Sequence, residues 1–327
     1  MVLPFTHDAL HYATAFFVTR LTLPVHNSTQ STALISPINM DHKVNRRLPI
    51  LDHIVVLVSY QTLNELPERL QGTLNVADGG GSSAGVTVNK LVIFPDGCYL
   101  ELVAFSPDAD VEKRKCHRWG HLAEGAIVDW AYTLHDDGDF AAIQKHVNND
   151  DRGCCFYRDP IPGGRVKPDG TELRWAVSLA ASKPPGRELL RGAVPFWCLD
   201  KTPRDLRVPF QTNANANSNI SSVPASTNHP CGAWGVSELE ISVPQEEHDA
   251  LKHVFQSIHG TPGMGTDGNC WRFGTYSSSV KGERRIRLSL AETSKPLISL
   301  TLLGTEKSPR CIDIILGIQV NIISKLQ

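Results

Sequence analysis

The chain has 327 residues, of which 41% are hydrophobic and 20% charged, a composition typical of an ordinary globular protein with room for a large core or two domains. Its formal net charge of -2 gives no reason to expect a nucleic-acid or membrane partner. The eight cysteines form no CxxC pair, which argues against a zinc knuckle or redox dithiol. We expect them to be reduced thiols of a cytoplasmic protein.

Residues 1–47 are interpreted as an N-terminal extension. The apolar stretch Ala9–Leu23 is interrupted by His11 and Arg20, so it lacks the basic start and clean apolar core of a secretory signal. Few acids and some hydroxyl residues are features of a mitochondrial presequence, but Arg20 is the only strong base before Lys43. We therefore expect a poorly ordered extension.

The first repeating unit begins with the apolar strand Leu51–Ser59. A short helix and three strands follow it, at Leu63–Leu70, near Leu74, at Asn89–Phe94 and at Tyr99–Phe105. The turn Pro95–Cys98 joins the last two strands. Because proline presets φ and glycine accepts the left-handed conformation, this turn predicts a tight hairpin.

The second unit begins with the predicted strand Ala126–Leu134. Asp139 can cap a helix that carries Phe140, Ile143 and Val147 on one face, at helical spacing. Its later strands are expected at Cys154–Tyr157, Glu172–Leu179 and Ala193–Leu199. Together, the two units form a domain over residues 48–210.

A third unit follows a change in composition. Residues 211–228 are nearly all Asn, Ser, Thr and Ala and predict a flexible linker. Residues 229–304 predict a third βαβββ-like module, and residues 305–327 are a tail too short to span a bilayer. A βαβββ unit cannot bury both faces of its sheet alone, so the predicted fold is α+β, with repeated βαβββ modules forming curved mixed sheets around a cavity.

Two strands each carry one polar side chain among aliphatic residues. His53 lies in the first strand and Glu101 in the fourth. Alternate residues of a strand share a face, so both side chains can line one cavity. There they can chelate a divalent ion and polarise a substrate oxygen, or simply form a buried hydrogen bond that satisfies both groups.

Several segments resemble the glyoxalase-like domain family of the vicinal oxygen chelate superfamily. These are Leu51–His53, Asn89–Val92, Tyr99–Leu102, Glu112–Lys115, Pro195–Cys198 and Thr202–Arg204. The resemblance is strong over residues 49–210 and weak over 229–304. It implies paired modules whose concave face binds a divalent metal ion (Zn, Fe, Mn or Ni) and a small oxygenated ligand. In that setting His53 and Glu101 would be the metal ligands, with Glu101 also moving a proton.

The chain departs from the family pattern at two expected ligand positions. Ser82 stands where the pattern places a histidine, and Leu199 stands where a polar ligand often follows the Pro-Phe-Trp-Cys segment. A catalytic metal normally needs three protein ligands and an open position, and His53 and Glu101 supply only two. A third ligand from His117, His121, Asp129 or Glu238 cannot be placed from the sequence.

Basic and aromatic residues follow the Glu101 strand and the end of the second unit. The cluster from Lys113 to His121 predicts either an anion-holding rim or a solvated connection. Arg204 and Arg207, which follow the last strand of the second unit, can bind a carboxylate bidentately. Alternatively, they can form ion pairs with Asp200 or Asp205. The predicted substrate-binding residues are Asn89, Arg114, Trp119, Arg204 and Arg207.

The functional hypothesis is a protein that binds a small oxygenated organic molecule, with metal-dependent lyase, isomerase or dioxygenase chemistry if it is an enzyme. The alternative is a metal-free protein that binds or sequesters its ligand without turnover. A third reading is a scaffold in which the extra unit drives self-association into a homodimer.

Overall fold

The computed structural model describes most of the chain beyond residue 47. Its described ranges are 48–81, 85–184, 188–211, 224–277, 282–305, 307–315 and 318–324. The N-terminal extension, Ser82 and most of the linker at 211–228 therefore lie outside the described residues.

The first unit forms a βαβββ module. Its elements are β1 (Ile50–Leu57), α1 (Tyr60–Arg69), β2 (Ala77–Gly81), β3 (Thr87–Ile93) and β4 (Tyr99–Phe105). Ser59 caps α1 by accepting a hydrogen bond from the Thr62 amide at 3.0 Å. The β3–β4 turn is tight, because Gly97 takes a φ of 89° and the Asp96 carboxylate accepts from the Cys98 amide at 2.9 Å. These features match the helix and the hairpin expected from the sequence.

The second unit repeats this plan with added short strands. A short helix, α2 (Val111–Cys116), connects the units. The remaining elements are β5 (Ala126–Thr133), α3 (Phe140–Asn148), β6 (Cys155–Tyr157), β7 (Ile161–Val166), β8 (Glu172–Ser178), β9 (Ala180–Ser182), β10 (Phe196–Asp200) and α4 (Arg204–Arg207). Phe140, Ile143 and Val147 are the buried residues of α3, as their spacing predicts.

Both modules build one eight-stranded mixed sheet in the order β2-β3-β4-β1-β5-β10-β8-β7. The central strands β1 and β5 are antiparallel, while β1 is parallel to β4 and β5 is parallel to β10. Residues alternate between its faces. Leu100 and Leu102 of β4 join the main core with the helices, while Val103 and Phe105 belong to a separate cluster on the other, concave face.

A second sheet repeats the strand order of the first without its edge strands. Its elements are β11 (Gly235–Val243), α5 (Gln245–His259), β12 (Cys270–Arg272), β13 (Arg285–Leu290), β14 (Leu297–Gly304), β15 (Cys311–Ile315) and β16 (Ile318–Ser324). The order β12-β13-β11-β14-β16-β15 has the same parallel and antiparallel pairings as β3-β4-β1-β5-β10-β8. The segment after residue 304, treated as a tail in the sequence analysis, thus supplies two strands. These curved mixed sheets confirm the predicted fold class.

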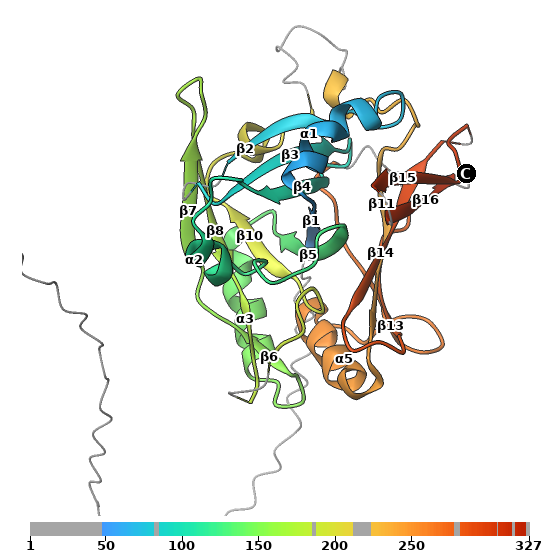
Figure 1. The fold of residues 1–327 in the computed structure, drawn as a ribbon. Helices are drawn as coiled ribbons and strands as arrows, with labels where there is room; N and C mark the ends of the chain where they lie inside the picture. Colours follow the sequence, from blue (N-terminus) through green and yellow to red (C-terminus); the bar gives the residue numbers. More distant parts are fainter. Residues whose placement is uncertain are drawn as a thin grey trace, which may run out of the picture. The chain divides into compact units, whose positions relative to one another are not determined.

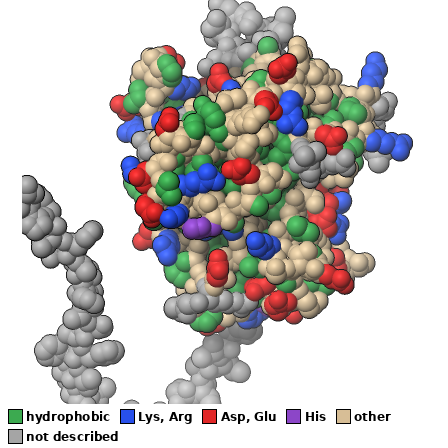
Figure 2. All heavy atoms as spheres, viewed as in Figure 1, with side chains coloured by type: hydrophobic (Ala, Val, Ile, Leu, Met, Phe, Trp, Pro, Cys, Tyr) green, Lys and Arg blue, Asp and Glu red, His purple; other side chains and the backbone are tan. Residues whose placement is uncertain are grey.

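One continuous hydrophobic core joins the two sheets and includes buried residues of α3 and α5. Figure 1 shows these two helices at the end of the molecule where the sheets meet. Trp130 of β5 stacks on Phe255 of α5, with ring centroids 6.3 Å apart. A buried ion pair adds a polar link, because Asp96 accepts from Arg284 at 2.7 Å and from the Val236 amide at 3.0 Å. On the face seen in Figure 2, acidic and basic side chains are interspersed. No helix within the described ranges has the length and apolarity needed to cross a membrane.

Two buried histidines predict that stability falls as the solution is acidified. Burial lowers the pKa of His259 to about 3 and that of His229 to about 4. Between these values and the ordinary pKa of about 6.5, the unfolded chain binds protons that the folded chain does not. Moving from about pH 7 to about pH 5 should therefore cost about 2 kcal/mol for each histidine.

Denaturant titrations of His259→Gln should show this pH-dependent loss reduced by about 2 kcal/mol relative to the unmodified protein. The exposed residue His146 provides the control, because His146→Gln should leave the loss unchanged. If His259→Gln keeps the full pH dependence, His259 is not the neutral buried group described here.

Candidate functional site

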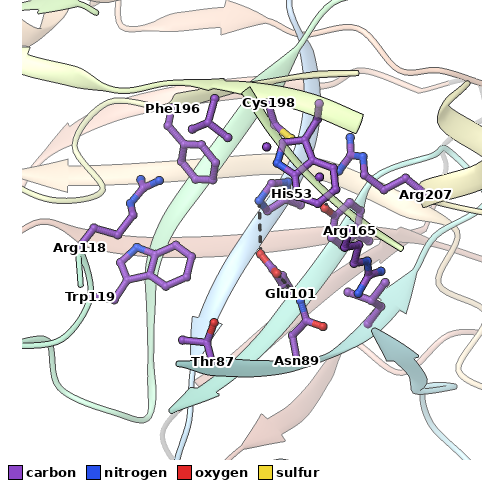
Figure 3. A pocket seen from close by; sticks show the side chains of 16 residues that line it. His53, Thr87, Asn89, Glu101, Arg118, Trp119, Arg165, Phe196, Cys198 and Arg207 are labelled. Carbon is purple, nitrogen blue, oxygen red and sulfur yellow. Dashed lines mark hydrogen bonds and ion pairs between the residues drawn. The ribbon is translucent and has the colours of Figure 1, made fainter. Parts of the chain in front are cut away.

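A cavity of about 370 Å³ occupies the concave face of the eight-stranded sheet (Figure 3). Side chains from β1, β3, β4, β7, β8 and β10 line it, and residues after α2 close one side. Most of its walls are aromatic or aliphatic, and a few polar groups converge on its interior. This combination is typical of small-molecule sites.

His53 projects from β1 into the cavity and is held on three sides. Its ring stacks on Tyr99 with centroids 4.8 Å apart and meets the edge of Phe196 at 5.2 Å. Its Nδ1 atom lies 2.5 Å from the Asp52 carboxylate. Its Nε2 atom faces Glu101, 3.5 Å from Oε2 (Figure 3). A carboxylate on one ring nitrogen therefore directs the other nitrogen into the cavity.

Glu101 lies on β4, and its side chain is 19% exposed. Its Oε1 atom accepts a hydrogen bond of 2.5 Å from the Asn89 amide group on β3. The Asn89 Oδ1 atom is buried and has no donor among the described residues. Glu101 Oε2 and Asn89 Oδ1 are therefore two acceptors at one edge of the cavity that a ligand hydroxyl or amine can satisfy.

Beneath His53, Asp52 is fully buried between two arginines. It accepts from Arg204 at 2.6 Å and from Arg207 at 2.8 Å, and both arginines also bind Asp200. Burial on its own raises the pKa of the Asp52 carboxyl, but Arg204, Arg207 and His53 outweigh burial and hold this pKa well below its usual range. Asp52 is therefore an ionised group that fixes the His53 ring.

Arg118 and Trp119 form the wall opposite Glu101. Both side chains donate to the Asp129 carboxylate on β5, Trp119 at 2.9 Å. The Arg118 guanidinium also lies over the Phe196 ring, 4.1 Å from its centroid. Burial lowers the pKa of Arg118, although the nearby Asp129 charge opposes that shift. This wall is thus a charged but largely internally paired surface.

Arg165 of β7 is a cavity residue that sequence reasoning missed. It donates to the Gly79 carbonyl of β2, so it connects the two edge strands of the sheet across the cavity. A side chain at Gly80 would collide with it, because an added Cβ would lie 2.0 Å from Arg165 Nη1. Arg165 forms no ion pair within the described residues, so its charge is available to a ligand. The glycines of Ile161–Val166 hide the period of two that would have marked a cavity strand.

The predicted substrate-binding residues separate into two groups. Asn89, Trp119 and Arg207 line the cavity together with His53 and Glu101. Arg114 does not, because it lies over the Phe105 ring and pairs with Glu124 at 3.3 Å. Arg204 does not either, because it is buried against Asp52 and the Tyr276 ring.

The donors that the described residues place on the concave face do not make a three-ligand metal site. Strand register relates the two modules: His53 pairs with Tyr99, and Ala131 pairs with Phe196. Two residues further along β4 and β10 are Glu101 and Cys198. The counterparts of His53 and Glu101 are therefore Ala131, which has no donor atom, and Cys198, whose pKa is raised by burial.

The remaining candidates for a third ligand lie elsewhere. Leu199 points into the helix-side core, whereas its neighbour Cys198 faces the cavity, as Phe196 does. Asp129 is bound by Arg118 and Trp119, and Glu238 pairs with Arg285 on the second sheet. Within the described ranges, no group of three His, Cys, Asp or Glu side chains is arranged to hold a metal ion. The donor set of the described residues therefore does not fit a catalytic metal ion with three protein ligands.

Comparison with known proteins identifies the family. The chain matches the family described as glyoxalase-like domain over residues 51–257. This match covers well over half of the chain, so the protein belongs to the glyoxalase-like domain family, as the resemblance in its motifs predicted. No curated protein matches the chain.

Among solved structures, a hypothetical protein from Staphylococcus aureus is 11% identical, with 85% of this chain and 100% of that chain covered and a TM-score of 0.56. A mutant 4-hydroxymandelate synthase from Streptomyces coelicolor is 10% identical, with 80% and 72% covered and a TM-score of 0.44. A 2,2',3-trihydroxybiphenyl 1,2-dioxygenase from Sphingomonas wittichii is 10% identical, with 85% and 91% covered and a TM-score of 0.40. The Staphylococcus protein shares the fold.

The buried cluster beneath His53 should be costly to disrupt. Asp52→Asn removes the negative charge with which both Arg204 and Arg207 pair. Asp200 is then the one carboxylate left, among the described residues, to pair with both buried guanidinium groups. We expect the free energy of unfolding to fall by about 3–5 kcal/mol, as measured by chemical denaturation.

The exposed residue Asp108 is the matched control, and Asp108→Asn should change stability by less than about 0.5 kcal/mol. Equal stability of the two variants would show that the Asp52 cluster does not hold the site together.

Proposed function

We propose that the cavity binds a small oxygenated organic molecule and that His53 acts on it as a general base. The observation that carries this proposal is the alignment of Asp52, His53 and Glu101. One carboxylate lies 2.5 Å from His53 Nδ1, and the other lies 3.5 Å from His53 Nε2, inside the cavity. A neutral imidazole that donates from Nδ1 to Asp52 leaves a lone pair on Nε2, and a ligand hydrogen that enters between Nε2 and Glu101 Oε2 meets an acceptor on each side.

The chemistry that suits this arrangement is proton transfer next to a carbonyl group. His53 Nε2 takes a proton from the carbon, and the electron pair of the broken C–H bond moves onto the carbonyl oxygen to give an enolate. Asp52 stabilises the imidazolium that forms, because it stays ionised beside Nδ1. Return of the proton to the enolate, or loss of a leaving group from it, gives isomerase or lyase chemistry. This proton transfer uses His53 and Asp52 and does not depend on a metal site with three protein ligands.

The cavity walls indicate the class of ligand. Trp119, Trp175 and Phe196 offer an aromatic lining for an apolar body. Arg165, which has no carboxylate partner within the described residues, can pair with a ligand carboxylate. Glu101 and Asn89 can accept from a ligand hydroxyl. A small carboxylic acid with an oxygenated carbon and an aromatic or apolar tail meets all three conditions.

The test uses 2-oxo-4-phenylbutyrate, which has a carboxylate, a carbonyl group with acidic neighbouring hydrogens and an aromatic tail. In heavy water, proton NMR measures deuterium uptake at the carbon beside the carbonyl group. We expect the protein to accelerate uptake above the background rate. His53→Gln should reduce that acceleration by about 100-fold or more. The dissociation constant of the variant for 2-oxo-4-phenylbutyrate should stay within about threefold of that of the unmodified protein.

Three outcomes separate the hypotheses. Uptake that depends on His53 and survives chelator treatment supports metal-free proton transfer. Binding without uptake supports the alternative, a protein that sequesters its ligand without turnover. Uptake that is unaffected by His53→Gln contradicts the role given to His53.

A further inference from the structure

A second cavity of about 440 Å³ lies beside the first and shares a wall with it. Arg118 and Phe196 line both cavities, so the guanidinium stacked on that ring separates them. The rest of the second cavity is formed by residues that follow α2, by β9 and by the segment before β10. The site described above makes no use of this space.

The lining of the second cavity is strongly basic. Five of its residues are basic: His117, Arg118, His121, Arg158 and Arg191. Two are acidic, Asp129 and Glu188.

Asp129 cannot neutralise the free arginines of the second cavity. It is 1% exposed and accepts from the Arg118 guanidinium, from Trp119 Nε1 at 2.9 Å and from the Trp130 amide at 3.1 Å. Arg158 and Arg191 therefore carry charge that no carboxylate pairs with in the described part of the chain. Among the described residues that line this cavity, Glu188 is the remaining counter-charge, and it is exposed, as are Arg158 and Arg191.

These positive charges act on one another. Burial lowers the pKa of His117, and the neighbouring charges of Arg118 and Arg191 lower it further. Arg191 also acts on Arg118, whose Nε atom is buried without an acceptor among the described residues. Like charges held together in a hollow create a positive potential that a bound anion relieves.

We propose that this second cavity is a binding site for a phosphate-type oxyanion carried by a small organic group. Arg158 and Arg191 supply forked donors that match phosphate oxygens, and His117 and His121 add ring N–H donors. A doubly charged group with several oxygens suits this set better than a monocarboxylate, which one arginine satisfies. The volume exceeds the needs of a single oxyanion, and Phe196, Leu179 and Leu189 give the organic part an apolar surface. The site stands independently of whether His53 is catalytic.

The experiment measures binding of phenyl phosphate to the full chain by isothermal titration calorimetry in a buffer of low ionic strength. We expect Arg191→Gln and Arg158→Gln each to weaken binding by about tenfold or more. Arg152→Gln is the matched control, because Arg152 is exposed, pairs with Asp150 and lies outside both cavities. His53→Gln should also leave phenyl phosphate binding unchanged, which separates this site from the first cavity.

Benzoate is the carboxylate comparison, and we expect it to bind at least about tenfold more weakly than phenyl phosphate. The proposal would be overturned if the double variant Arg158→Gln, Arg191→Gln bound phenyl phosphate as tightly as the unmodified protein does. Equal affinity for benzoate would overturn the preference for a phosphate-type group, and no measurable binding of phenyl phosphate would overturn the site itself.

Discussion

The site depends on one buried carboxylate. Asp52 lies in a bulge of β1, next to His53, and its side chain points toward the arginines of α4. An ionised group in the interior is stable only when it is paired and hydrogen-bonded, and here two guanidinium groups from the far end of the second module supply the pairing. The cluster therefore joins the start of the first module to the end of the second, and it sets the orientation of the His53 ring.

Repetition of one module explains where the cavity lies, and the differences between the copies determine which side chains line it. Pairing β1 with β5 brings two equivalent concave surfaces together in a single sheet. One half presents His53 and Glu101, whereas the corresponding positions of the other half are Ala131 and Cys198. The acceptor groups of His53, Glu101 and Asn89 therefore come from one half, whereas Trp175, Phe196 and the cation Arg165 come from the other.

Sequence patterns predicted the βαβββ modules because the residue periodicity of strands and helices and the residues of turns are set by local geometry. Alternation along β1 and β4 predicted that His53 and Glu101 can line one cavity, and the structure brings His53 Nε2 to 3.5 Å from Glu101 Oε2. Turn chemistry predicted the β3–β4 hairpin. Partners distant in sequence were not predictable in this way. The sequence predicts Arg204 as a substrate-binding residue, because nothing local shows that Asp52 lies buried beside it.

Two further features could not be predicted from the sequence: the place of Arg165 in the cavity and the strands β15 and β16. Arg165 follows two glycines, which carry no side chains to mark the faces of a strand, so its place over the cavity follows only from pairing with β8. The strands β15 and β16 are short, and the sequence alone predicts only a tail over residues 305–327. Their role is visible only when the second sheet is aligned with the first, where they occupy the places of β8 and β10.

The central claim is that Asp52 fixes His53 as the tautomer with hydrogen on Nδ1. Nitrogen NMR of the protein labelled with ¹⁵N-histidine tests this claim in alkaline solution, where a neutral imidazole shows widely separated signals for its protonated and bare nitrogens. With the signals assigned by their loss in His53→Gln, the account predicts a protonated Nδ1 and a bare Nε2. A protonated Nε2 with a bare Nδ1 would contradict it, because the lone pair would then face Asp52 instead of the cavity.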